Sequence, residues 1–287
     1  MRVPLLSLKR WMLPAADSAG IPFEGRSFHD HPFAGDDGSV PSALQGPLER
    51  WASLRSVADA LELADLARDL VDGLRGARVL IPLLAEAGSF GHTPEGRVVE
   101  KTQELSVVSV AAPDGYPMGL MFSDVASMAT WNQTARPVPV EAERVAAWAL
   151  TEGVSRVVLN PTADSECVFR SGPLAALVTG QPWVAPWADP EVMADVLSPW
   201  RGDEDSNVRD VQVSPGWDLH SGTGPDLVVR LVLRDGLNQH DLEQLSARWN
   251  AAWASSEAIR QKVSGILLRF VAEAGSDRVE GPSSPAR

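Results

Sequence analysis

The sequence predicts an α+β fold, a mixed α/β arrangement in which a mixed sheet with flanking helices precedes a smaller C-terminal β-α-β unit. Short apolar runs of strand length alternate with segments whose apolar residues recur every three or four positions, the period of a helix face. Residues 181–207 are rich in proline and tryptophan and end in an acidic run. Such a stretch is typical of a boundary between domains, and a chain of 287 residues is long enough for two of them.

We therefore divide the chain into five parts. They are an extended N-terminal arm (1–46), an α/β domain (47–180), a junction (181–207), a small C-terminal α/β domain (208–273) and a disordered tail (274–287).

The arm is rich in Gly, Pro, Ser and Asp, so no regular element is expected in it. It nevertheless carries Phe23, Phe28 and Phe33, and a purely disordered linker is usually poorer in aromatic residues. We expect the arm to be ordered and docked either on its own domain or on a neighbouring subunit. The sequence leaves both alternatives open, so a homo-oligomer assembled through the arm is one of them.

The first domain shows clear local signals for each of its elements. Residues 113–116 have turn chemistry and join two strands into a hairpin. Ser123-Asp124 precede a short helix and supply a cap, and Gly180 follows the last helix. Residues 47–74 are predicted as helical, and Ser56 is a candidate cap for a second helix inside this stretch. In order, the further predicted elements are strands 79–84, 105–111 and 117–122, helices 125–131 and 141–150, strands 157–159 and 167–170, and helix 174–178.

The second domain is predicted as a split βαβ-like unit. An apolar strand at 226–233 precedes a strong helix at 241–254, and a closing strand follows at 266–271. Ahead of them, Asp189-Pro190-Glu191 has the pattern of a helix start, with Asp as the cap and Pro at the first position.

Charge and cysteine content exclude several classes of function. The net charge of −13 disfavours nonspecific nucleic-acid binding, which needs clustered Lys and Arg, and disfavours docking on an anionic membrane. No apolar stretch approaches the ~18 residues of a spanning helix, and residues 1–13 lack the order of a signal peptide. A single cysteine, Cys167, permits no internal disulfide and fits a reducing cytosol. We expect a cytoplasmic protein.

Several short motifs, taken in their order and spacing, resemble the SseB-like family of actinobacterial type. They are segments 17–28 and 32–38, Leu80-Ile81-Pro82-Leu83, Phe122-Ser123, Val158-Leu159-Asn160-Pro161 and Pro182-Trp183. The resemblance implies the fold and a cytoplasmic setting. It offers no catalytic residues to carry over.

The side chains of a type that can bind a metal or act in catalysis have simpler structural explanations. His29-Asp30-His31 with Asp36-Asp37 offers transition-metal ligand types, but alternating histidines in such an arm seldom hold a fixed geometry. Ser123 lacks the Gly-x-Ser-x-Gly frame of an esterase elbow, so capping explains it better. Cys167 is expected to be a packed strand cysteine. We predict no metal, no cofactor and no catalytic residue.

Five residues form the candidate ligand or partner surface: Asn160, Ser123, Trp183, Trp187 and Trp200. Asn160 ends a strand, where its side chain either bonds local backbone at a turn or contacts a ligand. The three tryptophans either fill the groove between the domains or anchor a partner protein.

The leading hypothesis is a non-catalytic binding or scaffold protein that acts through protein contacts or a small ligand. The alternatives are a small-ligand-sensing module and an unrecognised hydrolase or transferase. A concave pocket that combines Asn160, Ser123 and an Asp or His within hydrogen-bond reach favours the enzyme. A flat apolar patch with exposed tryptophan favours protein binding.

Overall fold

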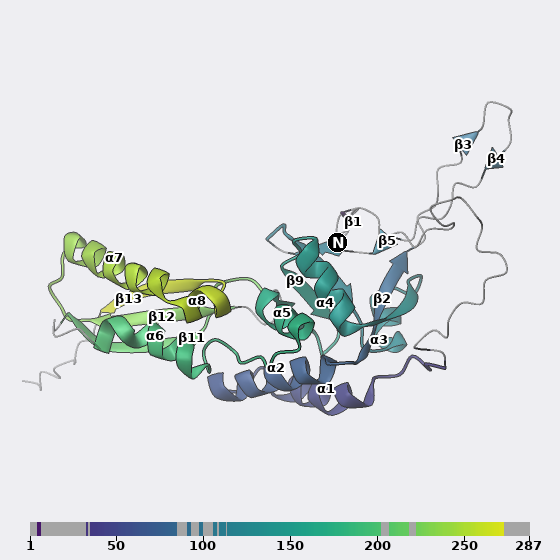
Figure 1. The fold of residues 1–287 in the computed structure, drawn as a ribbon, viewed down its shortest axis with the longest axis horizontal. Helices are drawn as coiled ribbons and strands as arrows, with labels where there is room; N and C mark the ends of the chain where they lie inside the picture. The colour runs from purple at the N-terminus through teal and green to yellow at the C-terminus, as the bar shows by residue number, and fades with distance from the viewer. Residues whose placement is uncertain are drawn as a thin grey trace, which may run out of the picture. The chain divides into compact units, whose positions relative to one another are not determined.

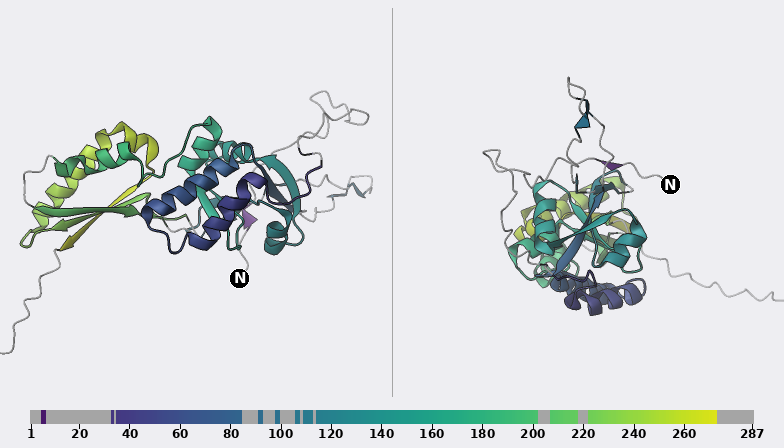
Figure 2. Two further views of the ribbon diagram at one scale, coloured as in Figure 1. Left: turned by 90° about the horizontal axis from the view of Figure 1, so that it is seen from below. Right: turned by 90° about the vertical axis from the view of Figure 1, so that its right-hand side faces the viewer.

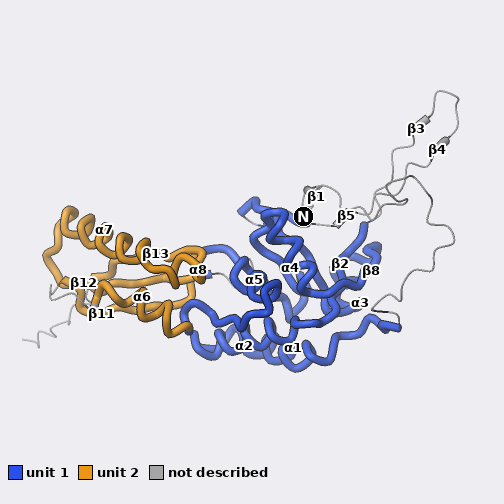
Figure 3. The backbone as a smooth tube through the Cα atoms, in the orientation of Figure 1, with its two compact units in different colours: residues 1–188, 217–224 blue, residues 189–216, 225–287 orange. Residues whose placement is uncertain are grey.

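The computed structural model describes residues 5–6, 33, 35–84, 91–92, 98–99, 106–107, 109–112, 114–201, 207–217 and 222–272. The chain divides into two compact units, one of residues 1–188 with 217–224 and the other of 189–216 with 225–287 (Figure 3). Within the described residues, eight helices and several mixed or antiparallel sheets confirm the predicted α+β fold (Figure 1).

A five-stranded mixed sheet lies at the centre of unit 1. Its strand order is β1 (Leu5–Leu6), β6 (Ser109–Ala111), β7 (Pro117–Met121), β9 (Arg156–Leu159) and β10 (Cys167–Arg170). β6 and β7 form the predicted hairpin, with Val110 opposite Met118. β7 and β9 are parallel, and the other neighbours are antiparallel. The carboxyl ends of β7 and β9 therefore meet at one edge of the sheet.

A smaller antiparallel sheet adjoins the first one. Its strand order is β5 (Ser106–Val107), β2 (Arg78–Leu84) and β8 (Arg136–Glu141). Leu80 and Phe122 exchange two backbone hydrogen bonds of 2.8 Å, which join the two sheets. A separate short pair is formed by β3 (Gly91–His92) and β4 (Val98–Val99).

β8 is a strand that the sequence did not predict, because it carries Pro137 and Pro139. Proline cannot donate to a ladder, so it is confined mainly to edge strands. Among the described residues β8 pairs only with β2, on one side, which explains how it accommodates both prolines.

Five helices pack with these sheets. They are α1 (Ser42–Leu54), α2 (Ala60–Leu74), α3 (Val125–Trp131), α4 (Ala142–Thr151) and α5 (Ser171–Thr179). The predicted helical segment 47–74 does contain a second helix, but its cap is Asp59, through a capping box with Glu62, and not Ser56. The core beneath them is apolar and includes Leu120, Phe122 and Val158.

Part of the predicted arm docks on its own domain. Asp36 forms an ion pair with Arg78 of β2, and the carbonyl of Gly38 accepts the Val125 N–H at 2.9 Å. Gly38 has φ +76° and lies so close to Val125 that a side chain there would clash. Phe23, Phe28 and His29–His31 lie outside the described residues, as do segment 202–206 and the tail from residue 273.

Unit 2 is a three-stranded sheet with helices on one face (Figure 2, left, green to yellow). In chain order its elements are α6 (Pro190–Arg201), β11 (Val208–Pro215), β12 (Leu227–Leu233), α7 (Gln239–Ser255), α8 (Glu257–Lys262) and β13 (Ile266–Ala272). The prediction of a split unit is wrong, because β12 and β13 are direct parallel neighbours. β11, a strand without a counterpart among the predicted elements, forms the edge of this sheet opposite β13.

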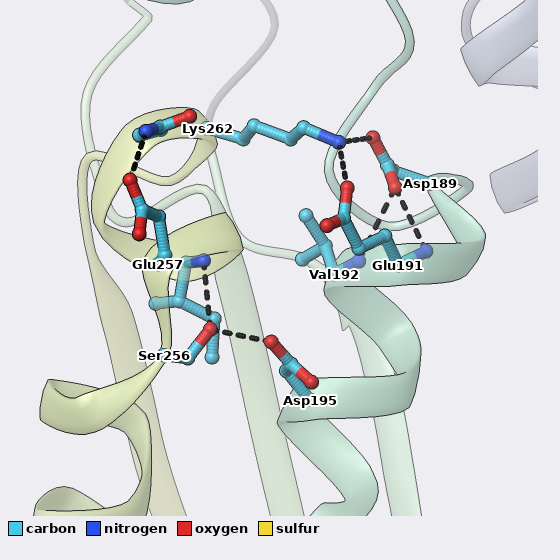
Figure 4. A network of polar contacts seen from close by, with 9 residues as sticks. Asp189, Glu191, Val192, Asp195, Ser256, Glu257 and Lys262 are labelled. Atoms are coloured by element: carbon cyan, nitrogen blue, oxygen red, sulfur yellow. Dashed lines mark hydrogen bonds and ion pairs between the residues drawn. The ribbon is translucent and has the colours of Figure 1, made fainter.

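A polar network joins the start of α6 to α8 in unit 2 (Figure 4). Asp189 accepts hydrogen bonds from the N–H groups of Glu191 and Val192 and so caps α6, as predicted. The Lys262 ammonium lies 3.0 Å from Asp189 and 2.6 Å from Glu191. A second contact joins the same two helices: the hydroxyl of Ser256, which caps α8, donates to Asp195 of α6 at 2.6 Å.

This network should make the stability of unit 2 depend on pH at both extremes. Burial pushes the pKa of Asp189 upward, but hydrogen bonds from Lys262 and the α6 amides outweigh it and hold the pKa below its ordinary value of 3.8. The Asp189 contribution is therefore lost as the pH falls through that lowered pKa. Glu191 and Asp189 raise the pKa of Lys262 above 10.5, so the Lys262 contribution is lost as the pH rises through the raised value.

We expect Lys262→Met to accelerate hydrogen exchange in α8 at neutral pH, by an amount equivalent to no more than about 1 kcal/mol. The effect is small because the lysine side chain is 40% exposed. Arg260→Met is the matched control, since Arg260 is more exposed and its ion pair with Glu257 is 4.0 Å long. Equal exchange rates in the two variants would show that the network adds nothing to the stability of unit 2.

Candidate functional site

The candidate site lies where β7 and β9 end side by side. The parallel register places Leu159 opposite Met121, so the residues that follow these strands become neighbours. The Ser123 N–H donates to Asn160 Oδ1 at 2.8 Å, and Asn160 Nδ2 donates to the Ser123 hydroxyl at 2.9 Å. Two of the five predicted site residues are thus brought together, and both are almost inaccessible to solvent.

The Asn160 side chain does not form the local backbone bond at a turn that was one of its two expected roles. The backbone of Asn160 is left-handed, with φ 51°, a conformation that Asn tolerates better than most residues. The side chain does not close a local turn onto its own backbone. It reaches across to Ser123 and also donates to the Ser165 hydroxyl at 3.1 Å. Asn160 therefore fixes the ends of two neighbouring strands against each other.

The helix cap at the start of α3 is Asp124, so the predicted cap at Ser123-Asp124 is confirmed for Asp124 and wrong for Ser123. Asp124 Oδ1 accepts the Ser127 N–H at 2.8 Å. Its Oδ2 accepts the hydroxyls of Ser123, at 2.7 Å, and Ser127, at 2.8 Å. Burial raises the pKa of Asp124, but these hydrogen bonds outweigh burial and keep the pKa below its ordinary value. Asp124 is therefore a charged carboxylate at neutral pH.

Arg78, at the start of β2, stabilises the backbone of the site. Its guanidinium donates to the Ser123 carbonyl at 2.7 Å and binds both carboxylate oxygens of Asp36, at 2.6 and 2.9 Å. It also donates to the Ser39 carbonyl. The arginine side chain is 8% exposed and that of Asp36 is 19% exposed. This pair links the docked arm to the segment that follows β7.

An open hollow of about 580 Å³ lies over these groups. Its lining mixes polar and apolar side chains, carries no Lys, Arg or His, and includes three carboxylates. The lining residues are Ser39, Val40, Gln45, Leu48, Glu49, Ala52, Ser123, Asp124, Ser127, Asn160, Asp164 and Ser165. Such a surface suits hydroxyl or ammonium groups and disfavours anions.

Residues 54–176 match the family model of the SseB protein N-terminal domain. The chain contains an SseB protein N-terminal domain. The matched segment runs from the end of α1 into α5 and contains Ser123, Asp124 and Asn160. No curated protein and no solved structure matches the chain. The narrower likeness to actinobacterial members stays a prediction.

The three predicted tryptophans are not among the residues that line the hollow. Trp183 and Trp187 are buried within unit 1, where Trp187 donates its ring N–H to the Ala60 carbonyl at 2.7 Å. The Trp187 ring also meets Trp217 edge-on at 5.5 Å. Trp200 lies on α6 of unit 2 and is exposed. The structure therefore unites Ser123 and Asn160 in one site and places none of the three tryptophans in its lining.

The other groups considered from the sequence show no chemical activation where the structure describes them. Cys167 is fully buried in β10, and burial raises the pKa of its thiol, so it is inert as a nucleophile. Asp36 is engaged by Arg78. Within the described segments, no three His, Cys, Asp or Glu side chains form a group able to hold a metal ion. In the same segments no helix has the length and apolar content needed to cross a bilayer.

Sequence reasoning missed several residues of the site. Gln45 and Glu49 reach the hollow from α1, and Asp164 lies in the turn after β9. No local pattern marks them, because only the packing of α1 brings its residues to the strand ends. Arg78 had one usable signal, since it is a charged residue at the start of an apolar run.

Proposed function

We propose that this SseB-like protein is a non-catalytic cytoplasmic binding protein whose hollow over Ser123, Asp124 and Asn160 holds a small polar ligand. The observation that carries the proposal is an open hollow at the carboxyl ends of two parallel strands, a common place for ligands in α/β sheets. Its floor is fixed before any ligand arrives, because Ser123, Asp124 and Asn160 bond one another.

The chemistry of the rim suggests the class of ligand. Glu49, Asp124 and Asp164 place carboxylates around the hollow, and its lining residues contribute no cation to balance them. A neutral polyol or a ligand with an ammonium group complements this surface better than a phosphate or a carboxylic acid.

A hydrolase or transferase is the second candidate, and one observation favours it. The hollow does combine Asn160 and Ser123 with an Asp within hydrogen-bond reach. Two features weigh against it. Ser123 is fully buried, and the lowered pKa of Asp124 makes that carboxylate a weak base for activating a hydroxyl. Ser123 and Asp124 are better suited to holding the floor in place.

The test is a thermal-shift screen with amines, amino acids, sugars and nucleosides, followed by two variants of α1. Ala52→Trp adds a large ring to the lining of the hollow, whereas Ser53→Trp is the control on an exposed neighbour outside it. A compound that binds at the hollow should stabilise the wild type and Ser53→Trp and lose at least about tenfold in affinity for Ala52→Trp.

Equal affinity of all three proteins would place the ligand elsewhere and contradict the proposal. The bound compound should also be recovered unchanged after prolonged incubation. Turnover of the compound that is lost in a folded Ser123→Ala variant would establish the enzyme instead.

A further inference from the structure

One face of the sheet in unit 2 is uncovered by the helices of that unit (Figure 2, left). The opposite face packs under α6, α7 and α8, and its central residues Leu227, Val229 and Leu231 are completely buried. By the strand register, the open face consists of Asp210, Gln212 and Ser214 of β11, Arg230 and Val232 of β12, and Leu267, Arg269 and Val271 of β13. Val228 of β12 has the same orientation but is buried.

Two arginines lie side by side at the centre of this open face. Arg230 and Arg269 are register partners on neighbouring strands, and like charges directly opposite each other are unfavourable. Arg230 donates to the Ser214 hydroxyl at 3.2 Å. Within the described residues neither guanidinium has a carboxylate partner. In a chain of net charge −13, two adjacent arginines that form no ion pair with a described carboxylate indicate a site for an external carboxylate.

Apolar side chains flank the arginines along the strands. Leu267 precedes Arg269 and Val271 follows it on the same face, and these residues are 38% and 41% exposed. Val232 extends the apolar surface beside Val271. Across the strands, register partners form rows, and along the strands an apolar row, a cationic row and a second apolar row follow one another. Successive rows are two residues apart along each strand, which is about 6.6 Å.

This spacing fits a helix better than an extended chain. Residues four apart on one helix face are separated by about 6 Å along the axis. A helix also satisfies its own backbone hydrogen bonds, whereas an extended segment lying flat on a sheet face leaves them without protein partners. We propose that the open face of the unit 2 sheet binds an amphipathic helix of a partner protein, with a carboxylate between two apolar side chains one turn before and after it.

The test uses the full chain and a synthetic Ala/Gln-based helical peptide, with Glu at its centre and Leu four residues before and after it. A second peptide carries Lys in place of Glu. The Glu peptide should bind with a Kd on the order of 100 μM and shift the NMR signals of residues 210–214, 228–232 and 267–271. The Lys peptide should bind at least about tenfold more weakly.

Charge reversal makes the test specific. The double variant Arg230→Glu with Arg269→Glu should bind the Glu peptide at least about tenfold more weakly and should bind the Lys peptide. Arg248→Glu with Arg260→Glu makes the same change of charge on exposed positions of α7 and α8 and should leave both affinities unchanged. Circular dichroism of each variant checks that it is folded.

Several results would overturn the proposal. They are equal binding of the Glu and Lys peptides, no binding of the Glu peptide up to about 1 mM, and an unchanged preference after charge reversal. A short RNA whose binding depends on the two arginines and displaces the peptide would assign the face to nucleic acid. A dimer in sedimentation that Arg230→Glu with Arg269→Glu dissociates would assign it to a second copy of this chain.

Discussion

Replacing Arg78 by methionine should lower the free energy of unfolding of unit 1 by about 3 kcal/mol or more. The substitution keeps an apolar stem but leaves the half-buried Asp36 carboxylate without its cation, and it removes the donors to the Ser123 and Ser39 carbonyls. Removing one partner of a largely desolvated pair is costly because the other charge stays in place without compensation. Hydrogen exchange of the β2 and β7 amides measures the effect.

Arg50→Met is the matched control for this substitution. Arg50 also pairs with an aspartate, Asp69, but its side chain is 54% exposed, and exposed pairs contribute less than about 1 kcal/mol. A loss in Arg78→Met as small as that in Arg50→Met would mean that the docked segment around Asp36 is not held by this ion pair.

Replacing Asn160 by alanine should destabilise unit 1 by about 2–4 kcal/mol. The change leaves the Ser123 N–H without its acceptor in a fully buried place and forces a left-handed backbone on a residue that disfavours it. Glycine adopts that backbone freely, so Asn160→Gly should lose about 1 kcal/mol less than Asn160→Ala. Urea unfolding of the three proteins gives both differences.

Asn132→Ala serves as the comparison for a polar side chain in an ordinary turn. Asn132 Oδ1 accepts from the N–H and hydroxyl of Thr134, two residues ahead, and its loss should cost under about 1 kcal/mol. Two Asn160 variants as stable as Asn132→Ala would refute the role of Asn160 in fixing the strand ends. Equal losses of stability in Asn160→Ala and Asn160→Gly would show that the left-handed backbone at residue 160 does not add to the cost of the alanine substitution.

Elements with local signals could be predicted from the sequence. The hairpin of β6 and β7 follows from the turn between residues 112 and 116, and α5 ends where Gly180 adopts a left-handed backbone, φ 68°. The start of α6 at Asp189 is equally local. In each case a few consecutive residues satisfy their own backbone groups, so neighbouring residues carry enough information.

Groups that meet across long stretches of chain could be identified only once the chain was seen folded. β8 exists as a strand because β2 pairs with it, and β13 lies beside β12 with β11 on the far edge because pairing, not order in the chain, sets a sheet. Ser123 meets Asn160 through the β7–β9 register, and Arg78 meets Asp36 through the docked arm. The candidate site depends on these distant contacts, since its floor and rim come from strands, a helix and a loop that local patterns cannot place together.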